Sequence, residues 1–145
     1  MAALIDTNIL VYRFDPRFPQ KQQTAERILR RHIAEGTGRV AHQAIVEFFS
    51  VVTTPTKRRP RLLTSEEASQ EVEFLLNGFD VLYPNQVVLR TALHGLAVHQ
   101  LSWYDAHLWS YAEVYGISEL ISEDFQHDRV YGTVRVLNPF LDLQN

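Results

Sequence analysis

The chain alternates short apolar runs with longer segments in which apolar residues recur every three or four positions. The short runs predict strands at residues 3–5, 39–41, 79–83, 119–121 and 133–137. The longer segments predict helices at residues 9–14, 20–35, 43–53, 65–77, 85–99 and 102–116. Because strands alternate with helices, the pattern predicts an α/β fold with a mostly parallel central sheet of four to five strands.

The composition is that of an ordinary globular protein. Residues 1–145 are expected to form a single domain, because no linker, repeat or low-complexity tract interrupts the alternation. No apolar run approaches the roughly 18 residues that span a bilayer, so no membrane contact is expected. The absence of cysteine excludes disulfides, thiolate metal sites and cysteine nucleophiles, and fits a cytoplasmic location.

Two acids follow separate predicted strands. Asp6 comes directly after the strand at 3–5, and Asp124 comes three residues after the strand at 119–121. In open parallel sheets, ligands bind just beyond the carboxyl ends of the strands. We therefore expect both carboxylates at one edge of the sheet.

Two further acids lie on predicted helices. Asp105 is in the first turn of the helix that begins after Ser102, which directs it towards the same edge. Glu47 is flanked by apolar residues and shares a narrow polar stripe with Gln43 and Ser50.

Each acid alone also has a purely structural interpretation. Asp6 is a suitable helix N-cap, and Asp105 a suitable acidic half of a capping box. The stripe around Glu47 fits a solvated helix face, and Asp124 fits an ordinary acidic turn. The four acids together indicate a metal site. Four carboxylates at one sheet edge would repel one another unless a hard divalent cation lay among them. Mg²⁺ and Mn²⁺ prefer such oxygen ligands, and either ion can activate water for attack on a phosphodiester.

Four segments resemble the motifs of PIN domains, and more closely those of VapC-type toxins from bacterial or archaeal toxin–antitoxin pairs. They are "LIDTNILVY", "AIVEFF", "WYDAHLWSYAEVYG" and "LISEDF". The resemblance covers nearly the whole chain, in the same order and spacing. It implies an α/β/α sandwich and a metal-dependent endoribonuclease that acts on RNA, pairs with a cognate antitoxin protein and often forms homodimers.

The resemblance also implies roles for individual residues. The residues implied to bind Mg²⁺ or Mn²⁺ and to carry catalysis are Asp6, Glu47, Asp105 and Asp124. The residues implied to support them are Thr7, Asn8 and Ser122. Glu123 departs from the family pattern, where a basic or neutral residue is common, and Asp128 is an alternative to Asp124 as fourth ligand.

A basic block and an aromatic pair are candidates for RNA contact. The block at 57–61 offers Lys57, Arg58, Arg59 and Arg61 to RNA phosphates, or else forms a merely solvated loop. Tyr104 and Trp103 adjoin Asp105 and can stack on a base, although we expect at least one of them in the core.

Other function classes compete with a nuclease. A phospho-accepting receiver domain also carries acids at strand ends, but it requires paired acids after the first strand, and here Asp6 stands alone. A PIN-like module that binds RNA or a partner without catalysis would carry the same acids. A sugar or phosphate-ester hydrolase remains open because a fold does not fix a function.

Overall fold

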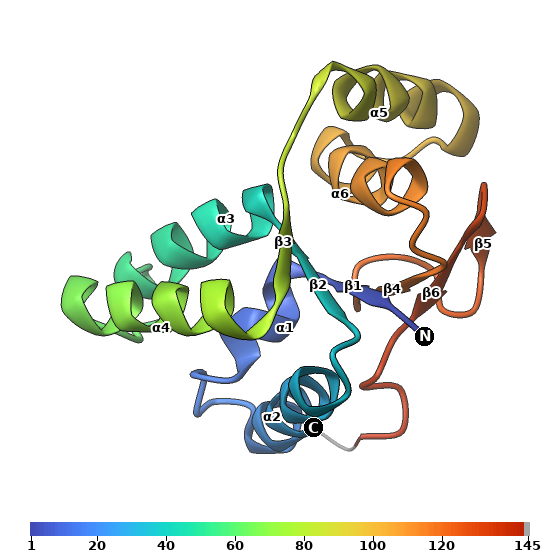
Figure 1. Cartoon of the computed structure of the whole chain (residues 1–145). Helices are drawn as coiled ribbons and strands as arrows, with labels where there is room; N and C mark the ends of the chain where they lie inside the picture. The colour runs from blue at the N-terminus through green and yellow to red at the C-terminus, as the bar shows by residue number, and fades with distance from the viewer. Residues whose placement is uncertain (144–145) are drawn as a thin grey trace.

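Six strands form one sheet with helices on both of its faces (Figure 1). The structure is a computed structural model that describes residues 1–143. The strands are β1 (Ala3–Ile5), β2 (Gly38–Ala41), β3 (Asp80–Leu82), β4 (Glu119–Ile121), β5 (Val130–Tyr131) and β6 (Val134–Leu137). Their order is β3–β2–β1–β4–β6–β5, and every neighbouring pair is parallel except β5 with β6. The predicted α/β fold with a mostly parallel sheet is confirmed.

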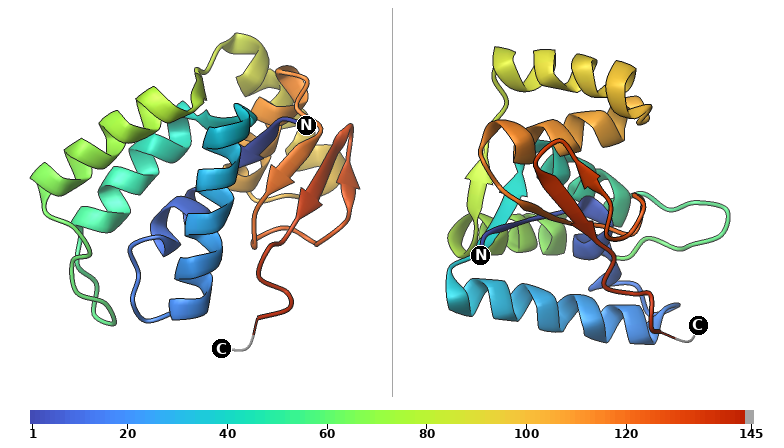
Figure 2. Two further views of the ribbon diagram at one scale, coloured as in Figure 1. Left: turned by 60° about the horizontal axis from the view of Figure 1, so that its bottom comes forward. Right: turned by 90° about the vertical axis from the view of Figure 1, so that its right-hand side faces the viewer.

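Helices form a layer on each face of the sheet, and one further pair of helices projects away from it. The helices are α1 (Thr7–Tyr12), α2 (Pro19–Glu35), α3 (His42–Thr53), α4 (Ser65–Gly78), α5 (Gln86–His99) and α6 (Trp103–Val114). Helix α2 covers one face of the sheet, while α5 and α6 pack together over the other (Figure 2). Helices α3 and α4 pack against each other and extend away from the sheet (Figures 1 and 2). None of the helices in residues 1–143 is long and apolar enough to cross a bilayer.

The pairing of β1 with β4 determines where Asp6 and the residues after β4 lie. Strand β1 is buried on both faces, with side chains at most 1% exposed, as its apolar sequence predicts. It pairs in parallel with β4, Ile5 opposite Ile121, and the backbone N–H of Asp6 donates to the carbonyl of Ile121 at 3.0 Å. The residues that follow β1 and β4 therefore emerge side by side at one edge.

Two features differ from the sequence prediction. The sheet has six strands rather than four to five, because β5 forms a hairpin with β6 through Gly132 at φ +62°. Two residues are too few for hydrophobic periodicity to reveal a strand. Helix α1 begins at Thr7, two residues before the predicted start, because Asp6 caps it.

Gly95 lets α5 approach α6 closely. A Cβ added at Gly95 would lie 2.7 Å from the Trp109 ring, which is 2% exposed and donates its indole N–H to the Tyr131 carbonyl. Gly95→Ala should therefore lower the free energy of unfolding by about 1–2 kcal/mol, although alanine normally favours a helix interior. Denaturant titration measures this change, with the exposed Ala97→Gly as control for propensity alone. A more stable Gly95→Ala protein would contradict the close packing.

Candidate active site

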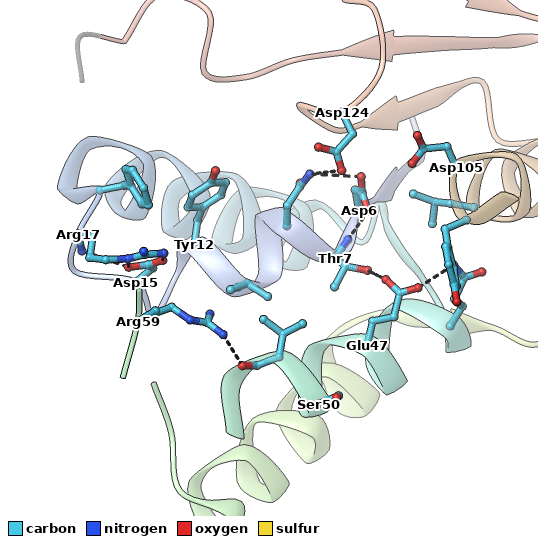
Figure 3. A pocket seen from close by; sticks show the side chains of 17 residues that line it. Asp6, Thr7, Tyr12, Asp15, Arg17, Glu47, Ser50, Arg59, Asp105 and Asp124 are labelled. Carbon is cyan, nitrogen blue, oxygen red and sulfur yellow. Dashed lines mark hydrogen bonds and ion pairs between the residues drawn. The ribbon is translucent and has the colours of Figure 1, made fainter. Parts of the chain in front are cut away.

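A cavity of about 750 Å³ opens at the edge of the sheet where β1 and β4 end (Figure 3). Among the residues that line it are the predicted Asp6, Thr7, Asn8, Glu47, Tyr104, Asp105 and Asp124. These residues come from four separate parts of the chain: the start of α1, helix α3, helix α6 and the segment after β4. The structure thus brings all four predicted acids to one cavity.

Asp6 connects β1 to the segment that follows β4. One carboxylate oxygen accepts the Thr7 backbone N–H at 2.6 Å, which makes Asp6 the N-cap of α1. The other accepts the Ser122 hydroxyl at 2.5 Å and the Asn8 amide at 3.4 Å. Asp6 is therefore both a helix cap and a side chain of the acidic cavity, and the two interpretations from the sequence are compatible.

Asp124 is held by two of the same neutral partners. The Asn8 amide donates to its carboxylate at 2.9 Å, and its own backbone N–H donates to the Ser122 hydroxyl at 3.1 Å. Asp105 lies in the first turn of α6, where its backbone N–H donates to the hydroxyl of the N-cap residue Ser102. Its carboxylate lies near those of Asp6 and Asp124 (Figure 3).

Glu47 is anchored between α1 and its own helix. The Thr7 hydroxyl donates to one carboxylate oxygen at 3.1 Å, and the Gln43 amide donates to the other at 2.9 Å. The polar stripe of α3 therefore lines the cavity here rather than forming a solvated face. Thr7 touches Asp6 and Glu47 at once and couples their positions.

The acids lie close together without a cationic partner. Burial raises the pKa of Asp6 to about 7, and the negative charges of Asp124 and Asp105 add to this effect, while the Ser122 hydroxyl opposes it. Partial desolvation, followed by the charges of Asp105 and Glu123, raises the pKa of Asp124. Within residues 1–143, no lysine, arginine or histidine forms an ion pair with any of the four acids.

The residues present suit a hard divalent cation. They offer carboxylate oxygens in a desolvated place, and the buried side-chain oxygens Asn8 Oδ1 and Gln43 Oε1 beside them lack a hydrogen-bond partner within the described chain. The side chains of residues 1–143 do not form a complete set of three acidic or histidine ligands. Such an arrangement fits Mg²⁺, which commonly takes one or two protein carboxylates and completes its shell with water.

The two uncertain acids lie elsewhere. Glu123 accepts hydrogen bonds from the Tyr12 hydroxyl and from Lys21, the latter at 2.9 Å, so its charge is compensated by an ammonium. Asp128 pairs with Arg135 at 2.8 Å. Neither lines the cavity, which leaves Asp124 as the acid supplied by the segment after β4.

The basic block divides into two kinds of residue. Lys57, Arg58 and Arg61 are exposed and do not line the cavity. Arg59 is only 9% exposed, so the loop is not solvated throughout, and its guanidinium reaches the cavity.

The aromatic pair next to Asp105 is not in the core. Tyr104 is 69% exposed and Trp103 38% exposed, so the expectation that one of them is buried is wrong. Both occupy the first turn of α6, and the buried residues of this helix begin at Ala106. Tyr104 is nevertheless one of the residues that line the cavity.

Tyr12, Asp15 and Arg17 line the cavity and were not among the residues predicted from the sequence, and neither was Lys21, which lies beside it. Arg17 lies in "DPRFP", where an acid two residues earlier is a weak sign of a local ion pair. Tyr12 and Lys21 meet Glu123, more than 100 positions away in the chain, and no local pattern signals that contact.

Comparison with known families settles the class of domain. A sequence model of the PIN domain matches residues 3–133. The chain belongs to the PIN domain family. A comparison with curated proteins finds no significant relative.

Solved structures share the PIN fold at low sequence identity. A toxin–antitoxin complex from Klebsiella pneumoniae matches with TM-score 0.67 and 19% identity, over 95% of this chain and 98% of the other. VapBC2 from Rickettsia felis, bound to a promoter DNA fragment, matches with TM-score 0.66 and 13% identity, over 94% and 97%. VapC20 from Mycobacterium tuberculosis, a toxin that cleaves the sarcin–ricin loop, matches with TM-score 0.60 and 16% identity, over 82% and 87%.

The pKa of Asp6 predicts how the stability of this PIN domain depends on pH. A carboxyl group with a pKa of about 7 when folded and about 3.9 when unfolded favours folding below pH 4 and loses that contribution as the pH rises to 7. With chelator present, Asp6→Asn should therefore raise the free energy of unfolding at pH 8 by on the order of 2 kcal/mol. The gain should disappear towards pH 4, as urea titrations across this range would measure.

Ser122→Ala is the matched control for this experiment. It removes the hydrogen bond to Asp6 but leaves the charge, so it should lower stability at pH 8 instead of raising it. Parallel stability curves for wild type and Asp6→Asn between pH 4 and 8 would contradict the assignment.

Proposed function

We propose that this PIN domain is a metal-dependent endoribonuclease and the toxin of a toxin–antitoxin pair. The observation that carries the proposal is the convergence of Asp6, Asp105 and Asp124 on one cavity, with Asp6 buried and no ion pair from residues 1–143 to any of the three. This arrangement costs folding stability, which is expected where the carboxylates serve a ligand rather than the fold.

The proposed ligand is Mg²⁺ or Mn²⁺. Asp6 and Asp105 would hold it directly, and Asp124 and Glu47 would complete the acidic site through water molecules bound to the ion. When bound, the ion supplies an activated water and stabilises the charge that develops on the phosphodiester.

The protein's own residues have the task of holding the reacting groups in place. Ser122 and Asn8 donate to Asp6 and Asp124, which keeps those carboxylates aimed into the cavity. Thr7 and Gln43 do the same for Glu47. Because these donors are neutral, they orient the acids without cancelling the negative charge that a cation requires.

Structural neighbours support the biological role. Two of them are toxin–antitoxin proteins and a third is a toxin that cleaves the sarcin–ricin loop, which supports RNA as substrate and an antitoxin as partner. We also propose a homodimer, because four large apolar side chains of α5 are at least 44% exposed: Val87, Leu89, Leu93 and Val98.

Cleavage of RNA by purified protein tests the proposal. Asp6→Asn and Asp105→Asn should each lower the rate in Mg²⁺ or Mn²⁺ by about 10²-fold or more, because each removes a charge from the site. Asp128→Asn also removes a carboxylate near β4, but that carboxylate faces Arg135 outside the cavity, so the rate should stay near that of wild type. Mapping RNA 5′ ends after induced expression of wild type and Asp6→Asn would locate the cleavage sites.

Two results would contradict the proposed nuclease activity. Folded Asp6→Asn and Asp105→Asn proteins that cut RNA as fast as wild type would overturn the nuclease assignment. A wild-type protein that binds RNA but cleaves none with either metal would favour the non-catalytic binding module.

A further inference from the structure

The acidic cavity has a second end with the opposite charge. Arg17 and Arg59 line it together with Asp15, beyond Tyr12 at the far end of α1 (Figure 3). The six residues of α1 separate the two ends by about 9 Å, at a rise of roughly 1.5 Å per residue. One continuous cavity therefore joins four carboxylates to two guanidinium groups.

Both guanidinium groups are held by the protein. Asp15 is 2% exposed and accepts two hydrogen bonds from the Arg17 guanidinium, at 3.0 and 2.8 Å. The Arg17 guanidinium also lies over the Phe18 ring, 5.0 Å from its centre. Arg59 donates to the carbonyls of Val51 at 2.7 Å and Thr54 at 3.4 Å. Little side-chain freedom remains to be lost on binding a ligand.

This end of the cavity retains positive charge and free donors. The single carboxylate of Asp15 offsets only one of the two guanidinium groups. Within residues 1–143, Nη1 of Arg17 and both Nε and Nη1 of Arg59 make no hydrogen bond. Planar guanidinium donors are well matched to phosphate oxygens.

This inference rests on the proposed function and extends it: we propose that Arg17 and Arg59 form a subsite for a backbone phosphate of the RNA, next to the phosphate that is cut. The strand then lies along α1, with one phosphate at the acids and a neighbouring one at the arginines. Because the two ends carry different groups, the subsite fixes the direction in which the RNA strand lies along α1. Lys57, Arg58 and Arg61 remain outside this path.

Binding of RNA without metal tests the subsite separately from cleavage. The probe is a fluorescent 12-nucleotide single-stranded RNA of mixed sequence, titrated with chelator present at several KCl concentrations. Arg17→Gln should weaken binding about tenfold and lower the slope of log affinity against log salt by about 0.7, the value for one lost phosphate contact. Lys57→Gln and Arg58→Gln remove the same charge outside the cavity, and should change affinity by less than about twofold.

Arg59 needs a milder variant because its guanidinium supports the loop. Arg59→Lys keeps the charge but loses the planar donors, so it should weaken RNA binding while near-native stability is checked by urea titration. Arg17→Gln remains the decisive variant if Arg59→Lys does not fold.

Replacing one charged RNA linkage at a time by a neutral one identifies the phosphate that the subsite binds. In an oligoribonucleotide that wild type cleaves, a single methylphosphonate is moved from linkage to linkage. One position beside the cleavage site should lower wild-type affinity about tenfold, and Arg17→Gln should show no additional loss at that position.

The outcomes separate this inference from the proposed function. If wild type cleaves RNA but Arg17→Gln matches Lys57→Gln in affinity and salt slope, the subsite is overturned and the nuclease stands. If wild type neither binds nor cleaves RNA with Mg²⁺ or Mn²⁺, the proposed function fails and the subsite with it.

Discussion

The parallel pairing of β1 with β4 is the constraint on which the acidic cavity depends. It sets Ile5 opposite Ile121, and the next residue of each strand, Asp6 and Ser122, then share a hydrogen bond. A shift of one residue in this register would turn the side chain of Asp6 to the other face of the sheet. The side chains of β1 oppose such a shift because both faces are closely packed, so each side chain would have to fit the space of a neighbour of different size.

Around this pairing the protein holds negative charge with neutral groups. Amides and hydroxyls contact Asp6, Glu47 and Asp124, whereas Glu123 next door has its own ammonium from Lys21. Glu123 and Asp124 are adjacent in one loop, yet Glu123 is paired with a cation and Asp124 with a neutral amide. Lys21 offsets part of the charge of Glu123, although that charge still adds to the raised pKa of Asp124, and the acids of the cavity have no such partner within residues 1–143.

Much of this arrangement could be predicted from the sequence, because it follows from local rules. Acids directly after buried parallel strands must meet at one edge, and this predicts the meeting of Asp6 with Asp124. The approach of Glu47 and Asp105 follows less directly, since it depends on how α3 and α6 pack. The sequence named Arg59 as one of four basic candidates, but its burial, which sets it apart from the other three, was not predictable because it depends on backbone carbonyls at the end of α3. The contact of Lys21 with Glu123 and the two-residue strand β5 likewise leave no periodic signal.

The short helix α1 has a consequence for how this chain can change length. It spans the cavity between Asp6 at its start and Arg17 shortly after its end. Inserting one residue would rotate everything beyond it by about 100° and lengthen it by about 1.5 Å. Insertions and deletions should therefore be excluded between residues 7 and 12, so α1 acts as a fixed spacer in the evolution of the chain.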